Sequence, residues 1–385
     1  MFRKQEVTST VGLVLSGGGA RGAYQVGVLK AIADTLPRDA SIPFRVICGT
    51  SAGAINATVL ATLAAENYRT GVLKLERVWR NFTADKVYRT DLFSLMRCAY
   101  HWLGPIIFRG LSNNHASSLL DNTPLRLLLK KFIDFNVIQQ SINHDYLDAL
   151  SITASSYRSG ESITFFQGKP SLSNWRRSRR VGQRDQLTLQ HLMASAAIPV
   201  LFPAEAIDGA YYCDGAIRQT SPISPALHLG ADKIMAIGVR DKREPPPPLV
   251  NDAPYPSIAA TAGHFLNTVF LDSLDADIER LERINETVKM IPQKLSKKSG
   301  LPLKQIGLLK ISPSEPLDAI AREHVQELPK TLRFFFGRTG GLSSGGASFM
   351  SYLLFEKGFT RQIMDLGYYD AIAKRDEIKA FLQIG

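Results

Sequence analysis

The stretch Gly49-Thr50-Ser51-Ala52-Gly53 decides both the fold class and the chemistry that this sequence predicts. It has the G-x-S-x-G form of a nucleophile elbow, in which a serine stands on a sharp turn between a strand and a helix. The apolar run 44–48 before it predicts a buried strand, and residues 54–65 after it predict a helix. The context is therefore the one that the motif requires. A helix-capping serine in an ordinary turn of small residues is the alternative interpretation.

Glycines on both sides of the serine have a steric reason. A serine at the tip of so tight a turn has a strained backbone, and side chains at Gly49 and Gly53 would collide with the strand and the helix. The turn lifts the Ser51 hydroxyl clear of the sheet and places it near the N-terminus of the helix, where backbone N–H groups favour negative charge. The motif thus predicts Ser51 as a nucleophile.

A second glycine-rich turn lies upstream, at residues 16–22, with the sequence Ser-Gly-Gly-Gly-Ala-Arg-Gly. The run 11–15 before it predicts a strand, and the pattern from 23 to 36 predicts a helix. Three of its glycines have the spacing of a dinucleotide-binding fingerprint, but the next strand ends without the acidic residue that would bind the ribose. A P-loop would also need a Lys-Ser/Thr pair, which is missing. A nucleotide-binding module stays open as an alternative function.

Acyl-ester hydrolysis accounts for both turns together. Attack of Ser51 on an ester carbonyl produces an oxyanion, which needs preorganised N–H donors close to the nucleophile. Consecutive glycines leave their amides bare and let a loop approach the substrate closely. We therefore predict an oxyanion hole formed by the amides of Gly17, Gly18 and Gly19, with the amide of Ala52 as a further donor.

The serine needs a base, and none of the seven histidines stands in a segment that is built to present one. His228, at a predicted helix end, is one candidate, in the order serine, acid, histidine of other hydrolases. Asp214 is the candidate that we favour, because the short apolar strand 210–213 delivers it into a turn at Gly215. An aspartate before a glycine at a strand end is often only a turn residue. The flanking sequence therefore has to distinguish a turn residue from a catalytic base.

Those neighbours give a sequence that resembles the patatin-like phospholipase family. The glycine loop, the elbow and the motif Asp214-Gly215-Ala216 occur in the order of that family. The segment 194–199, Ala-Ser-Ala-Ala-Ile-Pro, and the prolines that follow the aspartate motif fit it as well. The resemblance covers roughly residues 8–240. Two positions depart from the common pattern: Ser16 stands where many members have Asp, and Gln219 where an Asn is often found.

The resemblance implies a Ser51–Asp214 dyad without histidine, which hydrolyses acyl esters of phospholipids or other lipids through an acyl-enzyme. Partial burial would raise the pKa of the aspartate and make it a better base than a free carboxylate. Arg21 either stiffens the glycine loop or attracts an anionic head group. The motifs also assign supporting roles to Arg21, Gly22, Gly49, Gly53 and Gly215.

Composition and length are those of an ordinary globular protein: 385 residues, 45% hydrophobic and 21% charged. The three cysteines form no disulfide framework, and no metal-ligand spacing occurs, so we predict neither a metal nor a cofactor. The N-terminus lacks the features of a signal peptide, and no run reaches the ~18 apolar residues of a spanning helix. These features predict a cytoplasmic or peripheral membrane location.

The formal net charge is +11, and it is gathered in two clusters. One cluster comprises Arg176, Arg177, Arg179, Arg180 and Arg184, and the other Lys294, Lys297, Lys298 and Lys304. Solvated loops often carry such charge. Attraction to an anionic membrane is the more specific interpretation, worth roughly 1 kcal/mol per basic residue near the surface. No stacking platform accompanies the charge, so we predict no nucleic-acid binding. A catalytically inactive protein of the membrane surface is the second alternative function.

Alternating strand and helix patterns predict an α/β fold, with a mostly parallel central sheet and helices on both faces. We divide the chain into a catalytic domain, residues 8–240, with a helical insert at 66–145, and a mainly helical C-terminal region, 257–385, packed on it. A proline-rich loop, 241–256, joins the two.

Three local expectations complete the prediction. Residues 171–186 are expected to form a polar, arginine-rich loop. Residues 258–291 show one long helical pattern, and a late strand is expected at 306–311. The aromatic side chains of the insert, Trp79 and Phe82 among them, are expected to form either a lipid-entry surface or plain core.

Overall fold

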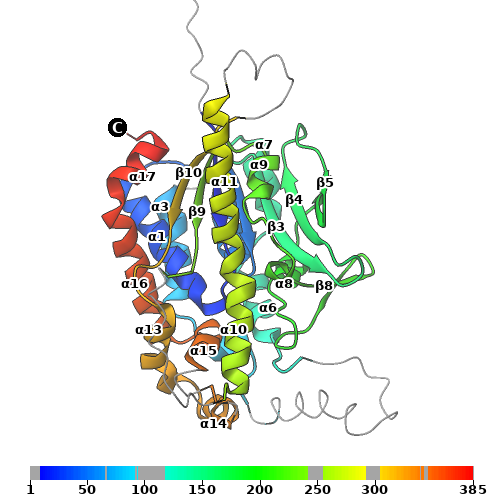
Figure 1. Ribbon diagram of the computed structural model, residues 1–385, viewed down its shortest axis with the longest axis vertical. Coiled ribbons are helices and arrows are strands. Elements are labelled where there is room, and N and C mark those ends of the chain that lie inside the picture. The colour runs from blue at the N-terminus through cyan, green and yellow to red at the C-terminus, as the bar shows by residue number, and fades with distance from the viewer. Residues whose placement is uncertain are drawn as a thin grey trace, which may run out of the picture.

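The computed structural model describes residues 9–65, 67–91, 93, 118–241, 255–291, 304–338, 340–341 and 346–384. Its centre is one sheet with helices on both faces (Figure 1). The strands are β1 (Val11–Leu15), β2 (Val46–Thr50), β3 (Ala149–Ser156), β4 (Ser162–Gly168), β5 (Trp175–Arg177), β6 (Arg180–Arg184), β7 (Glu205–Ile207), β8 (Ala210–Asp214), β9 (Lys233–Ile237) and β10 (Gly307–Ile311).

The main path of this sheet has the order β10-β9-β1-β2-β3-β4-β6-β5. Five successive strands, from β10 to β3, run parallel, and β3 pairs with β4 in the antiparallel sense. Strands β7 and β8 form an antiparallel pair that joins the end of β3. The predicted fold class, a mostly parallel α/β sheet flanked by helices, is confirmed.

The longer helices are α1 (Gly22–Thr35), α2 (Ala52–Thr62), α3 (Tyr68–Trp79), α6 (Thr123–Phe132), α7 (Asn136–Asn143), α10 (Ile258–Phe270), α11 (Asp272–Met290), α13 (Leu317–His324), α14 (Lys330–Arg338), α16 (Lys357–Ala373) and α17 (Arg375–Leu382). Shorter helices are α4 (Ala84–Val87), α8 (Leu189–Ser195), α9 (Ser224–His228) and α15 (Ala347–Leu353), with 3₁₀ turns at Gly19–Arg21, Gly215–Ile217 and Val325–Glu327. Within these residues no helix combines the length and the apolar character that crossing a membrane requires.

The two faces of the sheet are buried by different helices because side chains alternate along each strand. Leu13 and Leu15 of β1 enter a large core that includes α1, α2 and α16. Val14 between them enters a smaller core with Cys48 of β2 and with side chains of α9 and α11. Strand β1 is therefore apolar on both faces, as a parallel strand between two helical layers has to be.

The C-terminal region is closely joined to the rest of the chain. Strand β10 extends the sheet next to β9, and α16 lies against α1. A Cβ atom on Gly27 of α1 would lie 1.8 Å from the carbonyl oxygen of Met364. The two helices therefore touch at their backbones, and the Tyr24 hydroxyl donates a hydrogen bond to Asp370 at 3.0 Å. The proposed division of the chain near residues 240 and 257 stays a prediction.

The predicted loop at 171–186 is wrong, because the structure has strands β5 and β6 there. Trp175 stacks on Phe166 of β4 with ring centroids 5.2 Å apart. Arg184 donates hydrogen bonds to the carbonyl groups of Gly168 and Lys169 at 2.7 and 2.8 Å. One aromatic stack and one arginine thus stabilise this hairpin, although the polar composition of the segment predicted a loop.

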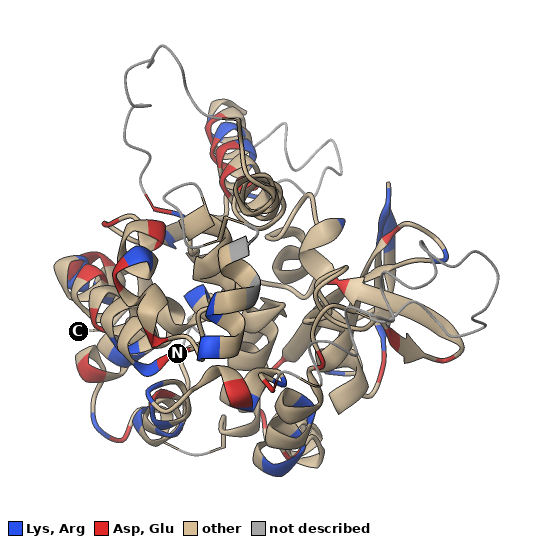
Figure 2. Cartoon of the chain, turned by 90° about the horizontal axis from the view of Figure 1, so that it is seen from below, with Lys and Arg blue, Asp and Glu red and all other residues tan. Residues whose placement is uncertain are grey.

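The single helix predicted over 258–291 is also wrong, because α10 ends at Phe270 and α11 begins at Asp272. Phe270, Leu271 and Leu274, on both sides of this boundary, are all buried. Figure 2, the view from below, marks acidic and basic residues along the ribbon of the rod that these helices form; α11 carries them, and the sequence of α10 has none. The predicted proline-rich loop lies mostly outside the described residues.

Candidate active site

Ser51 stands at the junction of β2 and α2, and its backbone is strained. Its φ of 55° and ψ of −128° are uncommon for a residue with a side chain. The Ser51 N–H donates a hydrogen bond to Ser195 Oγ at 2.9 Å, and Ser195 Oγ donates to the Thr153 carbonyl group of β3 at 2.7 Å. A Cβ atom on Gly53 would lie 2.3 Å from the Leu15 carbonyl oxygen, so only glycine lets α2 begin this close to β1.

Asp214 ends β8, opposite Ala154 of β3, and it is 0% exposed. Its Oδ1 accepts a hydrogen bond from the Ala216 N–H at 3.0 Å. Burial raises the pKa of its carboxyl group to about 7, although interactions with the Ser51 hydroxyl and the Ala216 N–H lower it in part. The contact with Ser51 is looser than a hydrogen bond, since Oδ2 has no hydrogen-bond partner among the described residues. Asp214 is thus a carboxyl group that ionises near neutral pH beside the serine.

The glycine loop lies directly against Ser51. A Cβ atom on Gly17 would lie 3.0 Å from Ser51 Cβ and 2.7 Å from the ring of Phe270. Within the described part of the chain, the N–H groups of Gly17 and Gly18 donate no hydrogen bond. Gly19 has a φ of 55°, in the region that favours glycine, and its Cα approaches the carbonyl group of Tyr352. Two backbone donors without partners therefore lie in the loop next to the serine.

Arg21 anchors this loop to the C-terminal region. Its side chain is 2% exposed, and its Nε donates a hydrogen bond to Ser351 Oγ at 2.8 Å. Its guanidinium group lies 4.4 Å from the centroid of the Tyr352 ring. The Tyr352 hydroxyl in turn donates to Asn267 Oδ1 of α10 at 2.8 Å. Arg21 is therefore placed to stiffen the loop, and its burial disfavours the alternative of a contact with a head group.

Gln219 connects β2 and β3, the strands next to Ser51. Thr50 Oγ1 donates a hydrogen bond to Gln219 Oε1 at 2.7 Å. Gln219 Nε2 donates to Thr153 Oγ1 at 3.2 Å. These bonds hold the end of β2, just before Ser51, to β3. The side-chain amide at this position of the sequence is thus fully engaged in the support of the elbow.

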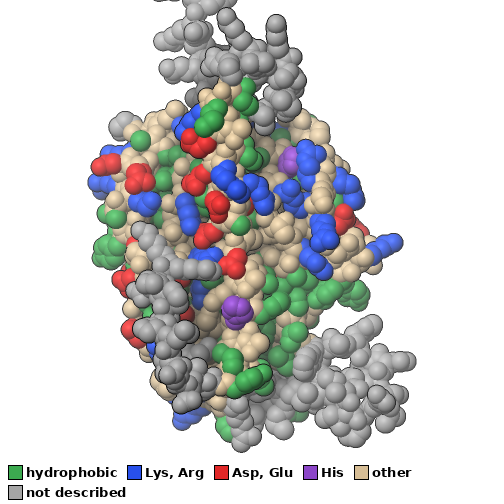
Figure 3. Space-filling model, in the orientation of Figure 1, with side chains coloured by type: hydrophobic (Ala, Val, Ile, Leu, Met, Phe, Trp, Pro, Cys, Tyr) green, Lys and Arg blue, Asp and Glu red, His purple; other side chains and the backbone are tan. Residues whose placement is uncertain are grey.

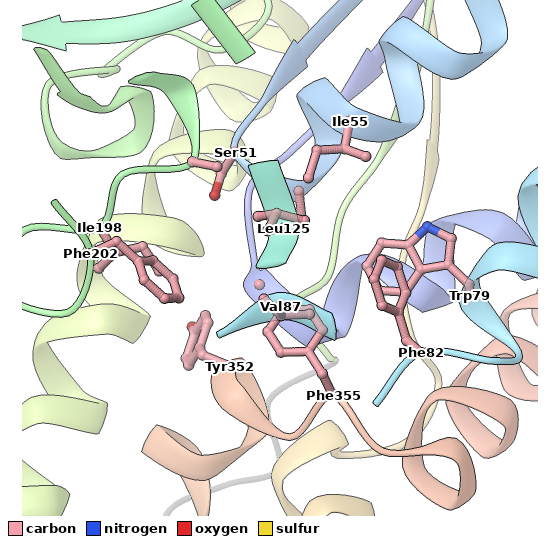
Figure 4. Close-up of a pocket in the computed structure, with 13 residues that line it drawn as sticks. Ser51, Ile55, Trp79, Phe82, Val87, Leu125, Ile198, Phe202, Tyr352 and Phe355 are labelled. Atoms are coloured by element: carbon pink, nitrogen blue, oxygen red, sulfur yellow. The ribbon is translucent and has the colours of Figure 1, made fainter. Parts of the chain in front are cut away.

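Ser51 opens onto an apolar pocket (Figure 4). In the close-up, Ile198 and Phe202 lie on one side of Ser51, Trp79 and Phe82 on the other, and Tyr352 and Phe355 below. The complete lining is Gly19, Ser51, Ala52, Ile55, Trp79, Phe82, Val87, Leu125, Ala196, Ile198, Phe202, Tyr352 and Phe355. A pocket of this kind accepts hydrocarbon and excludes polar groups, which would lose their hydrogen bonds there.

The structure brings Ser51, Asp214 and the glycine loop together, as the motifs predict, and separates them from His228. The His228 ring stacks on Trp175 at 4.8 Å. Its burial, together with nearby arginines, lowers its pKa. None of the five histidines that the structure describes lines the pocket.

Sequence reasoning did not assign roles to several residues of the site. Ser195 lies within the quoted segment 194–199, so a signal for it was present. Tyr352 and Phe355 come from the far end of the chain, where no motif marks them. Trp79 and Phe82 of the insert are buried pocket walls, whereas Trp102 and Phe108 lie outside the described residues.

Curated relatives match short parts of the chain. Lysophospholipase nte1 of Aspergillus terreus is 54% identical over 52 residues, which are 14% of this chain and 3% of that protein. Lysophospholipase nte1 of Aspergillus niger is 42% identical over 86 residues, 21% of this chain and 5% of the relative. The chain therefore spans only a small fraction of the length of these two proteins.

Two solved structures are distant neighbours. Human GIVD cytosolic phospholipase A2, in complex with methyl gamma-linolenyl fluorophosphonate, has a TM-score of 0.45 and 13% identity, covering 100% of this chain and 60% of that one. VipD from Legionella pneumophila has a TM-score of 0.36 and 14% identity, covering 90% and 67%.

The family model described as patatin-like phospholipase matches residues 13–227. The match begins in β1, contains the glycine loop, the elbow and Asp214, and ends in α9. Because it extends over more than half of the chain, this protein belongs to the patatin-like phospholipase family.

Proposed function

We propose that the protein hydrolyses carboxylic esters of acyl lipids, with Ser51 as the nucleophile and Asp214 as the general base. One observation carries this proposal: a strained serine lies beside a buried carboxyl group with a pKa of about 7, at the wall of an apolar pocket. The phospholipase family and the names of the lysophospholipase relatives support a lipid as the substrate.

Acylation begins when Ser51 Oγ attacks the ester carbonyl carbon and its proton passes to Asp214. Oδ2, the carboxyl oxygen without a hydrogen-bond partner among the described residues, is suited to accept it. The carbonyl oxygen becomes an oxyanion, to which the N–H groups of the glycine loop and the first amide of α2 would donate. Each such donor typically contributes roughly 3 kcal/mol to the transition state. The C–O bond then breaks, and the leaving alcohol takes the proton from Asp214.

Deacylation repeats these steps with water. Asp214 accepts a proton from a water molecule, whose oxygen attacks the acyl carbon of the Ser51 ester. The second tetrahedral intermediate collapses, Ser51 Oγ regains the proton, and a fatty acid leaves. One water molecule is consumed, and the enzyme returns to its starting state, so no metal or cofactor takes part in the proposed reaction.

The substrate class is tested by incubating the protein with vesicles that contain phospholipid, lysophospholipid or neutral acylglycerol, followed by mass spectrometry of the released fatty acids. We expect release from at least one class. Saturable stabilisation by NAD or ATP without cleavage of any ester would instead support the nucleotide-binding alternative.

We further propose that the basic hairpin β5–β6 attracts anionic membranes. The hairpin contains five arginines, and Figure 3 shows basic side chains over the part of the surface where it lies. Arg176 is paired with Glu161 at 2.7 Å, and Arg184 is bound to backbone carbonyl groups, so the exposed Arg177 and Arg179 are better placed for a lipid surface. Of the second predicted cluster, Lys304 pairs with Asp232; Lys294, Lys297 and Lys298 lie outside the described residues.

The variant Arg177→Gln/Arg179→Gln is expected to bind anionic vesicles about thirtyfold more weakly, since each arginine near the surface contributes roughly 1 kcal/mol. Added salt should weaken binding of the wild type, because it screens exposed charges. Sedimentation with anionic and neutral vesicles measures both effects. The control Arg375→Gln/Lys379→Gln removes the same charge from α17, on the opposite side of the molecule (Figure 1). Equal loss in both variants would contradict a contact through the hairpin.

A further inference from the structure

Three buried side chains, one each from α1, α2 and α3, form a chain of hydrogen bonds beside the glycine loop. Gln25 and Asn56 are 0% exposed, and Trp79 is 1% exposed. The Trp79 indole N–H donates to Asn56 Oδ1 at 2.8 Å, and Asn56 Nδ2 donates to Gln25 Oε1 at 2.9 Å. Gln25 Nε2 then donates to the Ser16 carbonyl oxygen at 2.8 Å and, more loosely, to that of Ile237 at 3.4 Å. The chain thus leads from a wall of the pocket to the first residue of the glycine-rich turn.

The orientation of both amide groups is fixed by the two ends of this chain. An indole N–H can only donate a hydrogen bond, and a backbone carbonyl oxygen can only accept one. Asn56 therefore has its oxygen toward Trp79 and its NH₂ group toward Gln25. Gln25 consequently has its oxygen toward Asn56 and its NH₂ group toward Ser16. If either amide turned over, buried polar groups would lose their partners, which is unfavourable.

The Ser16 carbonyl group belongs to the same planar peptide unit as the Gly17 N–H. In a trans peptide these two groups point in opposite directions, so the direction of one fixes the direction of the other. Helix α2 also confines the Ser16 oxygen, because a Cβ atom on Gly53 would lie 2.5 Å from it. The Gly17 N–H has no hydrogen-bond partner among the described residues, and Gly17 lies against Ser51. The bond from Gln25 therefore sets the direction of an unused donor beside the serine.

We propose that Gln25 is a positioning residue, which aims the Gly17 N–H at the oxyanion that forms on the substrate. This inference rests on the proposed ester hydrolysis at Ser51. Asn56 keeps the Gln25 amide in the orientation that donates to Ser16, and Trp79 keeps Asn56 in place. Gln25 does not line the pocket, so it acts through the glycine loop and not through contact with the substrate. A donor aimed in advance stabilises charge that develops only in the transition state, so Gln25 contributes to kcat and hardly to KM.

The first variant is Gln25→Met, which keeps a side chain of similar length but has no hydrogen-bond donor. With nitrophenyl butyrate as the substrate, we expect kcat to fall about 10- to 100-fold at unchanged KM, less than the loss typical when an oxyanion donor is deleted. Rates are expressed per active site, counted by exhaustive fluorophosphonate labelling, so that unfolded protein does not contribute.

An alkyl trifluoromethyl ketone provides a second readout, which a merely structural role would not change. Ser51 Oγ bonds to the ketone carbon, its proton passes to Asp214, and the ketone oxygen becomes an oxyanion in the position of the reacting carbonyl oxygen. The inhibition constant of this ketone should rise in Gln25→Met by about the factor by which kcat falls. An inhibition constant that stays at the wild-type value would contradict a role in aiming the donor.

Gln167→Met is the matched control for the loss of a buried glutamine. Gln167 lies on β4, where its side chain donates to Gln139 Oε1 at 2.9 Å and accepts from the Leu187 N–H at 3.1 Å. The control should keep the wild-type kcat and the wild-type inhibition constant, while thermal unfolding reports the loss of stability in both variants. Unchanged kcat in Gln25→Met, or an equal loss in the control, would overturn this inference alone.

Asn56→Leu tests the chain one step farther from the loop. Leucine has the shape of asparagine but cannot hold the Gln25 amide, so kcat should fall, though less than in Gln25→Met. Because both residues act through the same bond to Ser16, the double variant Gln25→Met/Asn56→Leu should be no slower than Gln25→Met. Losses that multiply in the double variant would contradict the chain. A wild type that neither cleaves an ester nor binds the ketone would overturn the proposed function itself.

Discussion

Ser51→Ala is expected to lower the rate of lipid ester hydrolysis by about 10⁶-fold, the loss typical when a catalytic serine is removed. Without the hydroxyl group no acyl-enzyme can form, and the oxyanion donors and the pocket alone provide only weak catalysis. The variant keeps the backbone amide that donates to Ser195, so the elbow should retain its structure. Fatty-acid release measures the activity, and thermal unfolding verifies the fold.

A matched control tests whether the loss of activity is specific to Ser51 or follows the removal of any buried serine hydroxyl group. Ser141 is also fully buried, but its Oγ donates to the carbonyl group of Ala61 at 3.3 Å, away from the pocket. Ser141→Ala should therefore hydrolyse lipid at nearly the wild-type rate. If Ser51→Ala were as active as this control, the protein would be a lipid-binding member of the family, and the proposed reaction would be wrong.

Asp214→Asn is expected to lower turnover by about 10⁴-fold, because an amide cannot accept the Ser51 proton at neutral pH. In the wild type, kcat/KM should rise with pH through about 7 as the carboxyl group ionises. Asp277→Asn is the matched control. Asp277 is buried, its pKa is raised mainly by burial, and it accepts a hydrogen bond from the N–H of Ile223, a residue of the smaller core.

Asp214→Asn should also change the stability of the fold, in a direction that depends on pH. The folded-state pKa of Asp214, about 7, lies above the ordinary value of 3.8. The folded protein thus binds this proton more tightly than the unfolded chain, so its stability falls as the pH rises from the lower value to the upper. Above pH 7 the full loss of folding stability from the buried, ionised carboxylate is present, and a neutral asparagine side chain removes this loss. Asp214→Asn should unfold at a higher temperature than the wild type at alkaline pH, and this advantage should vanish in acid.

A pH profile and two melting curves decide the role of Asp214. Near-wild-type turnover of Asp214→Asn, together with inactive His228→Ala, would replace the dyad by a histidine-based mechanism. A kcat/KM that is flat between pH 6 and 8 would contradict an aspartate base whose pKa lies near 7.

Local sequence predicted β1 and β2 well, because each is a short apolar run next to a glycine-containing turn. The run 11–15 coincides with β1, whereas the strand before the elbow begins and ends two residues later than its apolar run. Prediction failed where distant contacts decide. The polar hairpin β5–β6 has Trp175 stacked against Phe166 of a neighbouring strand, a contact that the local composition does not report.

The residues of the candidate site also fall into two groups: those that a local motif predicts, and those that only the fold brings to the site. Ser51, the glycine loop and Asp214 each lie in a short motif with its own steric signature, so the sequence alone could propose them. The pKa of Asp214 depends on complete burial, which no local pattern reports. Tyr352 and Phe355 reach the pocket because α15 packs against the loop at Gly19–Arg21, about three hundred residues away in sequence.

The central claim, that Ser51 is an activated nucleophile, is tested most directly by an alkyl fluorophosphonate and peptide mapping of the adduct. In the wild type we expect one covalent adduct, on Ser51, with loss of lipid hydrolysis in proportion to labelling. Ser51→Ala should not be labelled, and Asp214→Asn should be labelled far more slowly. An adduct on another serine, or no adduct on protein that still releases fatty acid, would contradict the account.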